Sequence, residues 1–220
     1  MISGSKTLAL LFGLSLSCWA NAQEPEARAA GSSSADAQAL IASLARPAPS
    51  RTPFAEARFM KVLEQPLVVS GELAWLGGDR LERRVEKPAR ETATIADGEV
   101  TQQREGRKPR SFSLRRAPQL QVLLDSFVAL LGGDAGRLNQ AFDVRQESHA
   151  GGWTLTLVPR DARVAKAIAS IQIDGRGGEP RCMRMQEADG DLAVDLLGDL
   201  AARMPAALTR DALAALCKGG

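Results

Sequence analysis

Residues that could perform catalysis are scarce in this chain of 220 residues. His149 is the only histidine, and Cys182 and Cys217 lie far apart, so the chain has no residue spacing typical of a metal site. No G-x-S-x-G elbow, phosphate-binding loop or dinucleotide fingerprint occurs. Asp and Glu residues are numerous, but their positions are typical of solvated strand faces and turns. The sequence therefore predicts a protein that is not an enzyme and that uses no metal and no cofactor.

Apolar residues at alternate positions leave two interpretations open, an ordinary filled core or a surface kept open for an apolar ligand. Val69, Leu73 and Trp75 share one face of an expected strand, because successive side chains of a strand point to opposite faces. The same alternation extends the candidate lipid-binding set to Phe112, Leu114, Leu155, Leu157, Ile171, Ile173, Met183 and Met185. Each acyl CH₂ taken out of water contributes about 0.8 kcal/mol, so such a face can bind lipid without specific polar contacts. The alternative for each of these residues is an ordinary filled core.

A longer apolar stretch, APQLQVLLDSFVALLGG, predicts a helix that starts near Pro118 and ends at Gly132-Gly133. Leu124 and Phe127 are three positions apart and are expected to project together from this helix. Both belong to the candidate lipid-binding set. The helix is apolar on more than one side.

Short strands with tight turns account for most of the remaining chain. Asp97-Gly98 is the strongest hairpin signal, and Gly77-Gly78-Asp79 predicts another turn. Regular spacing of such strands predicts two antiparallel meanders, about ten or eleven strands in all, which the apolar helix interrupts once. A short helix is expected over 35–46 and a second over 208–218, so the fold class is mainly β with some α.

The N-terminus has the pattern of a signal peptide. TLALLFGLSLSCWA is an apolar run of roughly 14 residues, shorter than the about 20 that span a bilayer. Ala20-Asn21-Ala22 after it fits a cleavage site. We therefore predict a signal peptide at 1–22, a disordered spacer at 23–34 and one domain at 35–220. The rival interpretation is a lipoprotein anchored through Cys18, although the residues before that cysteine depart from the usual pattern.

Composition and charge restrict the possible partners. The net charge is +2, aromatic residues make up 4% and tyrosine is absent, which argues against binding of nucleic acid. The segment REGRKPRSFSLRR, Arg104 to Arg116, is strongly basic. It is interpreted as an edge hairpin protected by charge, and alternatively as a contact for an acidic partner or anionic lipid headgroups.

Two cysteines remain after removal of the predicted signal peptide. An even pair in an oxidising compartment predicts one disulfide between Cys182 and Cys217, the alternative being two free thiols. Cys182 alternates with Met183 and Met185, so it is expected on the outer face of the sheet. A C-terminal helix laid against that face would bring Cys217 to it.

The order of these elements resembles the LolA family of periplasmic lipoprotein carriers and its relatives. The resemblance runs from about Phe54 to Leu197. It rests on FAEARFMKV, SGELAWL, RRVEKP, ATIADGEVT, WTLTLVP and IASIQIDGRGGEPRCMRMQEADGD. It implies an unclosed antiparallel β-barrel, or half-barrel, with a helical lid and a concave apolar face for acyl chains. Val69, Leu73 and Trp75 would then face the cavity, and the helix from Leu120 to Leu131 would cover it.

The function implied by this resemblance is that of a periplasmic carrier. It would shuttle a lipoprotein, or another acylated or lipid-like cargo, toward the outer membrane as a monomer, with an inner-membrane transporter and an outer-membrane acceptor as partners. Gly77-Gly78-Asp79 stands where the classical carriers have a turn with Pro and Arg, which identifies a divergent member. The alternative function is a periplasmic sensor or regulatory module, without enzymatic activity, built on the same half-barrel.

Overall fold

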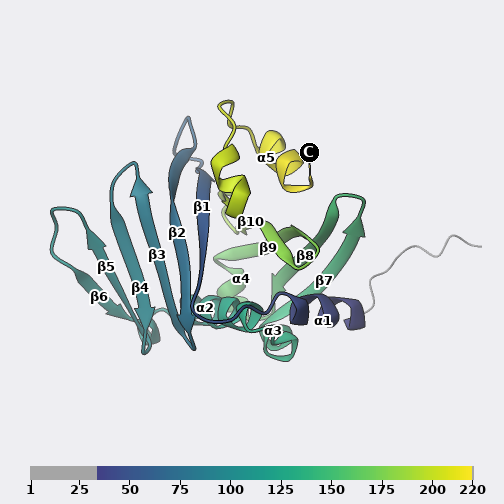
Figure 1. The fold of residues 1–220 in the computed structure, drawn as a ribbon. Coiled ribbons are helices and arrows are strands. Elements are labelled where there is room, and N and C mark those ends of the chain that lie inside the picture. The colour runs from purple at the N-terminus through teal and green to yellow at the C-terminus, as the bar shows by residue number, and fades with distance from the viewer. Residues whose placement is uncertain (1–33, 220) are drawn as a thin grey trace, which may run out of the picture.

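The computed structural model describes residues 34–219, and the predicted signal peptide and nearly all of the predicted spacer lie outside the described residues. Within this range, eleven strands form a single antiparallel sheet in the order β6-β5-β4-β3-β2-β1-β11-β10-β9-β8-β7 (Figure 1). The strands are β1 Ser50–Phe59, β2 Leu67–Gly77, β3 Arg80–Lys87, β4 Glu91–Ala96, β5 Glu99–Arg104, β6 Arg110–Ser113, β7 Phe142–His149, β8 Gly152–Pro159, β9 Ile168–Arg176, β10 Glu179–Glu187 and β11 Leu192–Leu197.

The sheet is an open half-barrel made of two meanders. Strands β1 to β6 form one meander and β7 to β11 the other, and they are joined in the middle by the antiparallel pair β1 and β11. The two edges, β6 and β7, do not pair with each other, so the sheet stays unclosed. The predicted fold class is confirmed, and eleven strands fall within the predicted number.

Local backbone chemistry produces the predicted hairpins. Asp97 and Gly98 both have positive φ, 52° and 72°, which is the conformation that a two-residue hairpin turn requires. The turn between β2 and β3 consists of Gly78 and Asp79. Gly78 and Gly77, the last residue of β2, both have positive φ. These positions set the register of the strands on each side, and Ile95 consequently pairs with Val100.

Five α-helices and two 3₁₀ helices complete the described chain: α1 Ser34–Ser43, η1 Leu114–Arg116, α2 Pro118–Leu131, α3 Ala135–Ala141, α4 Ala162–Ala165, η2 Gly198–Arg203 and α5 Arg210–Cys217. Helix α2 begins and ends where the sequence predicts. A Cβ at Gly133 would lie 3.0 Å from the Cβ of Ala45, so the glycine allows the end of α2 to approach the segment that follows α1. In the described residues no helix is both long and apolar enough to cross a membrane.

The inner face of the sheet is defined here as the face that carries Leu155 on β8 and Ile171 on β9. In the half formed by β7 to β10, which we call the C-terminal half, α1, α2 and α3 cover this face. We call the buried cluster of this half the sealed cluster. It consists of Ile41, Leu44, Ala129, Leu130, Leu138, Phe142, Trp153, Leu155, Leu157, Ile168, Ile171 and Ile173. In Figure 1 the helices α1, α2 and α3 gather beside this half, whereas β4, β5 and β6 extend away from it.

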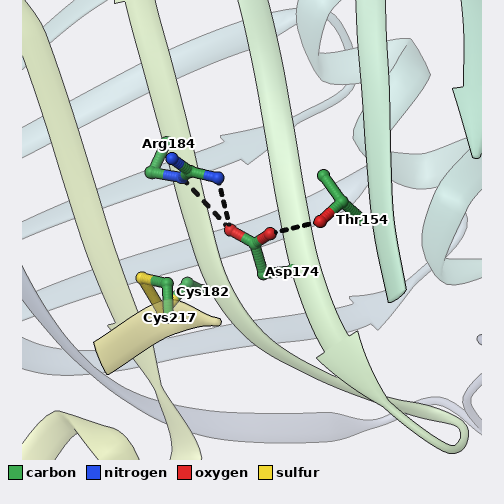
Figure 2. Close-up of a disulfide and its surroundings, with 5 residues drawn as sticks. All are labelled: Thr154, Asp174, Cys182, Arg184 and Cys217. Atoms are coloured by element: carbon green, nitrogen blue, oxygen red, sulfur yellow. Dashed lines mark hydrogen bonds and ion pairs between the residues drawn. A yellow bond between two sulfur atoms is a disulfide. The ribbon is translucent and has the colours of Figure 1, made fainter. Parts of the chain in front are cut away.

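The outer face carries a second, smaller cluster beneath α5. Cys182 and Cys217 form a disulfide there, with their Cα atoms 5.5 Å apart (Figure 2). Both cysteines are buried with Val194, Leu196 and Leu213. The structure therefore has the disulfide that the sequence predicts, on the face where Cys182 was expected.

A buried ion pair lies next to the disulfide. The carboxylate of Asp174 is fully buried and accepts hydrogen bonds from Thr154, at 2.6 Å, and from Arg184, at 2.8 and 3.1 Å. Figure 2 shows these three residues bridging β8, β9 and β10. Because the carboxylate is saturated by protein donors, this group is structural and ties the strands together on the outer face.

Candidate lipid-binding surface

An unbroken row of apolar side chains crosses the inner face of the other half of the sheet. Strand register pairs each member of the row with the next, from β2 to the edge strand β6. Its residues are Trp75, Leu81, Ile95, Val100 and Phe112. We call this set the apolar row. Because cross-strand neighbours on one face lie about 5 Å apart, the row is a continuous strip of apolar surface.

The apolar row is only partly covered by the rest of the molecule. Trp75, Leu81 and Ile95 are half-buried, and Phe112 is 37% exposed. By contrast, Val100 is buried. A strip of large apolar groups that keeps solvent access along most of its length is suited to take up an apolar ligand.

Only the two ends of the apolar row are among the residues that the sequence predicts to bind lipid. Trp75 and Phe112 belong to the predicted lipid-binding set, whereas Leu81, Ile95 and Val100 were missed as site residues. The sequence does contain a signal for these three residues, because the Asp97-Gly98 turn sets Ile95 opposite Val100. Extending that register to both neighbouring strands places the three residues on the same face as Trp75.

The remaining predicted residues of this half lie near the row. Val69 and Leu73 are half-buried on the inner face of β2. Leu73 lies opposite Arg83, so its surroundings are partly polar. Leu114 follows the edge strand in η1 and is 1% exposed. It is therefore a core residue of the connection between the sheet and α2.

Helix α2 packs against the sealed cluster over β8 and β9 through Leu123 and Phe127, which are both half-buried. The role of Phe127 in lipid binding stays a prediction. Leu124 is half-buried and is not part of that cluster. The two side chains predicted to act together therefore have different surroundings. The reason is that α2 has two apolar stripes and buries the one that fits the C-terminal half.

Six predicted lipid-contacting residues lie in the C-terminal half. Leu155, Leu157, Ile171 and Ile173 are at most 2% exposed. Met183 and Met185 are half-buried and pack against the same cluster. In this structure these side chains contact helices and strands. Their role in lipid binding stays a prediction, and it requires the helices to move.

A strip of charged residues on the inner face separates the two halves. It comprises Glu56 and Arg58 on β1, Arg83 on β3, Asp195 on β11 and Glu187 on β10, and we call it the charged strip. Arg83 donates a hydrogen bond to Glu56 at 2.7 Å, and Arg58 donates one to Glu187. The strip thus contains two ion pairs and one additional carboxyl group, that of Asp195.

Asp195 has an unusual environment within the charged strip. Asp195 is 6% exposed and lies directly opposite Glu56 across the β1–β11 pair. Burial and then the negative charge of Glu56 raise the pKa of Asp195 to about 8, against the opposing effect of Arg83 and Arg58. The carboxyl group is consequently mostly protonated at pH 7, in which form it can donate a hydrogen bond.

Two other features of the described residues have the general form of a binding site: a group of carboxylates and a cavity on the outer face. Glu187, Asp189 and Asp191 place carboxylate oxygens within 4.8 Å of one another. However, Glu187 pairs with Arg58, and Asp189 accepts a hydrogen bond from the backbone N–H of Asp191. Asp191 accepts one from the backbone N–H of Lys61, in the connection between β1 and β2. These protein contacts account for the cluster of carboxylates.

A cavity of about 270 Å³ lies on the outer face between α5 and β9 to β11. Its lining is largely polar and includes Ser170, Gln172, Arg184 and Arg210. It is on the opposite side of the sheet from the apolar row. A polar cavity of this kind is poorly suited to acyl chains, so the apolar row remains the candidate surface.

The basic segment from Arg104 to Arg116 lies at the β5–β6 edge of the sheet, as its interpretation as an edge hairpin requires. Arg104 pairs with Glu91 at 2.7 Å, and Arg107, Lys108 and Arg110 are exposed. A contact with an acidic partner stays a prediction. His149 is exposed at the end of β7.

Comparison with known proteins identifies the class. The model of the outer membrane lipoprotein carrier protein LolA-like family matches residues 29–220. The chain therefore belongs to the LolA-like family. A search of curated proteins gave no match.

Similar solved structures are distant in sequence. A LolA superfamily protein, NE2245 from Nitrosomonas europaea, is 12% identical, covers 76% of this chain and 92% of its own, and has a TM-score of 0.43. A putative outer membrane lipoprotein-sorting protein domain from Vibrio parahaemolyticus is 9% identical, with coverages of 84% and 100% and a TM-score of 0.42. The MucA/MucB complex of Pseudomonas aeruginosa includes a chain 16% identical, with coverages of 82% and 60% and a TM-score of 0.36.

Proposed function

We propose that this protein is a periplasmic carrier that holds acyl chains of a lipoprotein, or of another lipid-like cargo, against the apolar row and shuttles it toward the outer membrane. The observation that carries the proposal is the apolar row itself, a continuous apolar strip left half-exposed on the inner face of a half-barrel. Membership in the LolA-like family supports the same function.

The energetics of an apolar strip agree with a long-chain ligand. Each CH₂ removed from water contributes about 0.8 kcal/mol, or about fourfold in Kd. Association costs several kcal/mol in lost freedom of motion, so short chains bind weakly and long chains bind well. Affinity should therefore increase steadily with chain length in a series of fatty acids that differ by two carbons.

The site can be tested by a charge in the middle of the apolar row. Ile95→Glu places a carboxylate between Leu81 and Val100, where the acyl chain is proposed to lie. This position is preferable to Leu73, because a Glu at 73 would face Arg83 and be neutralised. The matched control is Thr92→Glu on the outer face of the same strand, opposite Arg84.

We expect Ile95→Glu to weaken binding of a fluorescent fatty acid by at least about tenfold, with little change in melting temperature. The control should bind like the parent. A folded Ile95→Glu variant that binds with parental affinity would contradict the proposal, and so would a variant that simply unfolds, because the row would then be ordinary core.

Mass spectrometry of organic extracts from the purified mature protein tests the cargo directly. Bound acyl species support a carrier. A protein that is free of lipid and binds no added acyl chain would favour the alternative predicted from the sequence, a regulatory module on the same half-barrel.

A further inference from the structure

The charged strip places two hydrogen-bond donors without protein acceptors beside the proposed acyl surface. The Nε of Arg58 is buried and has no hydrogen-bond partner among the described residues. Asp195 is nearly buried. The pKa of its carboxyl group is set by burial and by neighbouring charges, not by a hydrogen bond. Buried polar groups in proteins are nearly always satisfied, so the unpartnered Nε of Arg58 calls for an explanation.

The rest of the strip keeps these groups in place and balances their charge. Arg83 reaches across β2 to Glu56 at 2.7 Å and lies over the ring of Phe54, 4.8 Å from its centroid. Its guanidinium is thereby held by an ion pair and by an aromatic face. Arg58 is similarly paired with Glu187. Each arginine is matched by a glutamate, so the strip offers donors without a net positive charge.

The charged strip is continuous with the apolar surface of β2. Glu56 lies opposite Val69, and Phe54 lies opposite Gly71 in the β1–β2 pair. Arg83 lies opposite Leu73 in the next pair. An amphiphile with its chain along the inner face of β2 to β6 would therefore have its polar end at the strip.

We propose that the charged strip binds the polar end of the cargo, with the Nε–H of Arg58 and the carboxyl of Asp195 donating hydrogen bonds to a neutral carbonyl oxygen of an acyl ester or amide. Balanced charges favour a neutral acceptor over a carboxylate, since the nearby Glu56 and Glu187 repel a second anion. The inference rests on the proposed function and names the substrate class of the same site: acyl esters and amides rather than free fatty acids.

The test uses the full mature chain and two ligands. N-phenyl-1-naphthylamine, an apolar fluorescent probe, reports on the apolar surface alone. A monoacylglycerol that displaces it reports on both the chain and the ester. Arg58→Lys retains the positive charge beside Glu187 but removes the Nε–H. We expect this variant to bind the apolar probe like the parent and the monoacylglycerol about tenfold more weakly.

The pH dependence of the parent provides a second measurement that needs no variant. The charged groups that act on Asp195 are Glu56 and Arg58 on β1 and Arg83 on β3. When Asp195 loses its proton it can no longer donate. Monoacylglycerol affinity should therefore fall about fivefold between pH 7 and 9, while probe affinity stays constant. Asp195→Asn retains a donor and should remove this dependence.

The outcomes separate the two proposals. If the parent binds neither ligand, the proposed function fails and this inference fails with it. If the parent binds both, but monoacylglycerol affinity is flat with pH and is unchanged in Arg58→Lys, the carrier proposal stands and the polar-end site is refuted. A fatty acid of equal chain length that binds more tightly than the monoacylglycerol at pH 7 would also refute it.

Discussion

The two halves of the sheet follow the same alternation of apolar residues but differ in what covers their inner faces. On β8 and β9, Leu155 and Ile171 are 0% and 1% exposed beneath the helices. On β4 and β6, Ile95 is half-buried and Phe112 is 37% exposed. The difference arises because α1 and α3 pack on β7, and α2 packs on the same cluster beside α3 and α4. Alternation in the sequence therefore predicts which side chains share an apolar face. It does not distinguish a face that is buried in a core from one that is open to a ligand.

The largest expected difference between the halves is the cost of removing a side chain. Leu155→Ala leaves a cavity in the sealed cluster and should lower the free energy of unfolding by about 2–5 kcal/mol. Ile95→Ala should cost less than about 1.5 kcal/mol, because its side chain is already partly solvated. Urea denaturation of both variants measures the contrast. Equal costs would show that the two halves are equally packed.

Removal of the disulfide tests whether the outer face supports the C-terminal half. The double variant Cys182→Ala, Cys217→Ala releases a loop whose ends are 35 positions apart. It should lower the free energy of unfolding by about 2–4 kcal/mol. Because α5 lies on the outer face, binding of the apolar probe to the inner face should not change. A large loss of probe binding would show that the halves are not independent.

The charged strip at the boundary predicts a pH-dependent stability. The pKa of Asp195 is raised to about 8 in the folded protein, whereas the carboxyl of an unfolded chain loses its proton near pH 4. The folded state therefore binds one more proton in this interval, and stability falls as pH rises from about 4 to about 8. Between pH 6 and 8 the fall should be about 2 kcal/mol.

Asp195→Asn is the control for this effect. An amide of nearly the same shape cannot ionise, so the melting temperature of the variant should change much less between pH 6 and 8. At pH 8 the variant should be more stable than the parent. A parental pH profile in the variant would show that another group is responsible. Asp161, whose pKa is lowered to about 2 beside Arg163, ionises well below this interval.

The smallest effect is spectroscopic. Each half contains one tryptophan, Trp75 in the apolar row and Trp153 in the sealed cluster, where it is 6% exposed. Trp153→Phe and Trp75→Phe isolate the emission of each. A long-chain ligand should shift the emission of Trp75 to shorter wavelength and leave that of Trp153 unchanged. A response from Trp153 alone would place the ligand beneath the helices, in the half whose residues the sequence also predicted to bind lipid.

Elements that depend on local physical chemistry could be predicted from the sequence. Asp97-Gly98 formed the predicted hairpin because both residues accept positive φ. Helix α2 started at Pro118 and ended before Gly132, because proline suits the first turn and glycine the end. Alternation placed Val69, Leu73 and Trp75 on one face because successive side chains of a strand point in opposite directions. Each of these inferences involves residues only a few positions apart.

Packing between distant segments determines which apolar face is covered and where the charges meet. Arg58 and Glu187 are 129 positions apart and become partners through the pairing of β1, β11 and β10. Asp195 is buried opposite Glu56 by the same pairing, and no local pattern in either strand marks it. Helix α2 has two apolar stripes, and the sequence does not state which one is buried. That choice depends on packing between segments distant in the chain, which local periodicity does not encode.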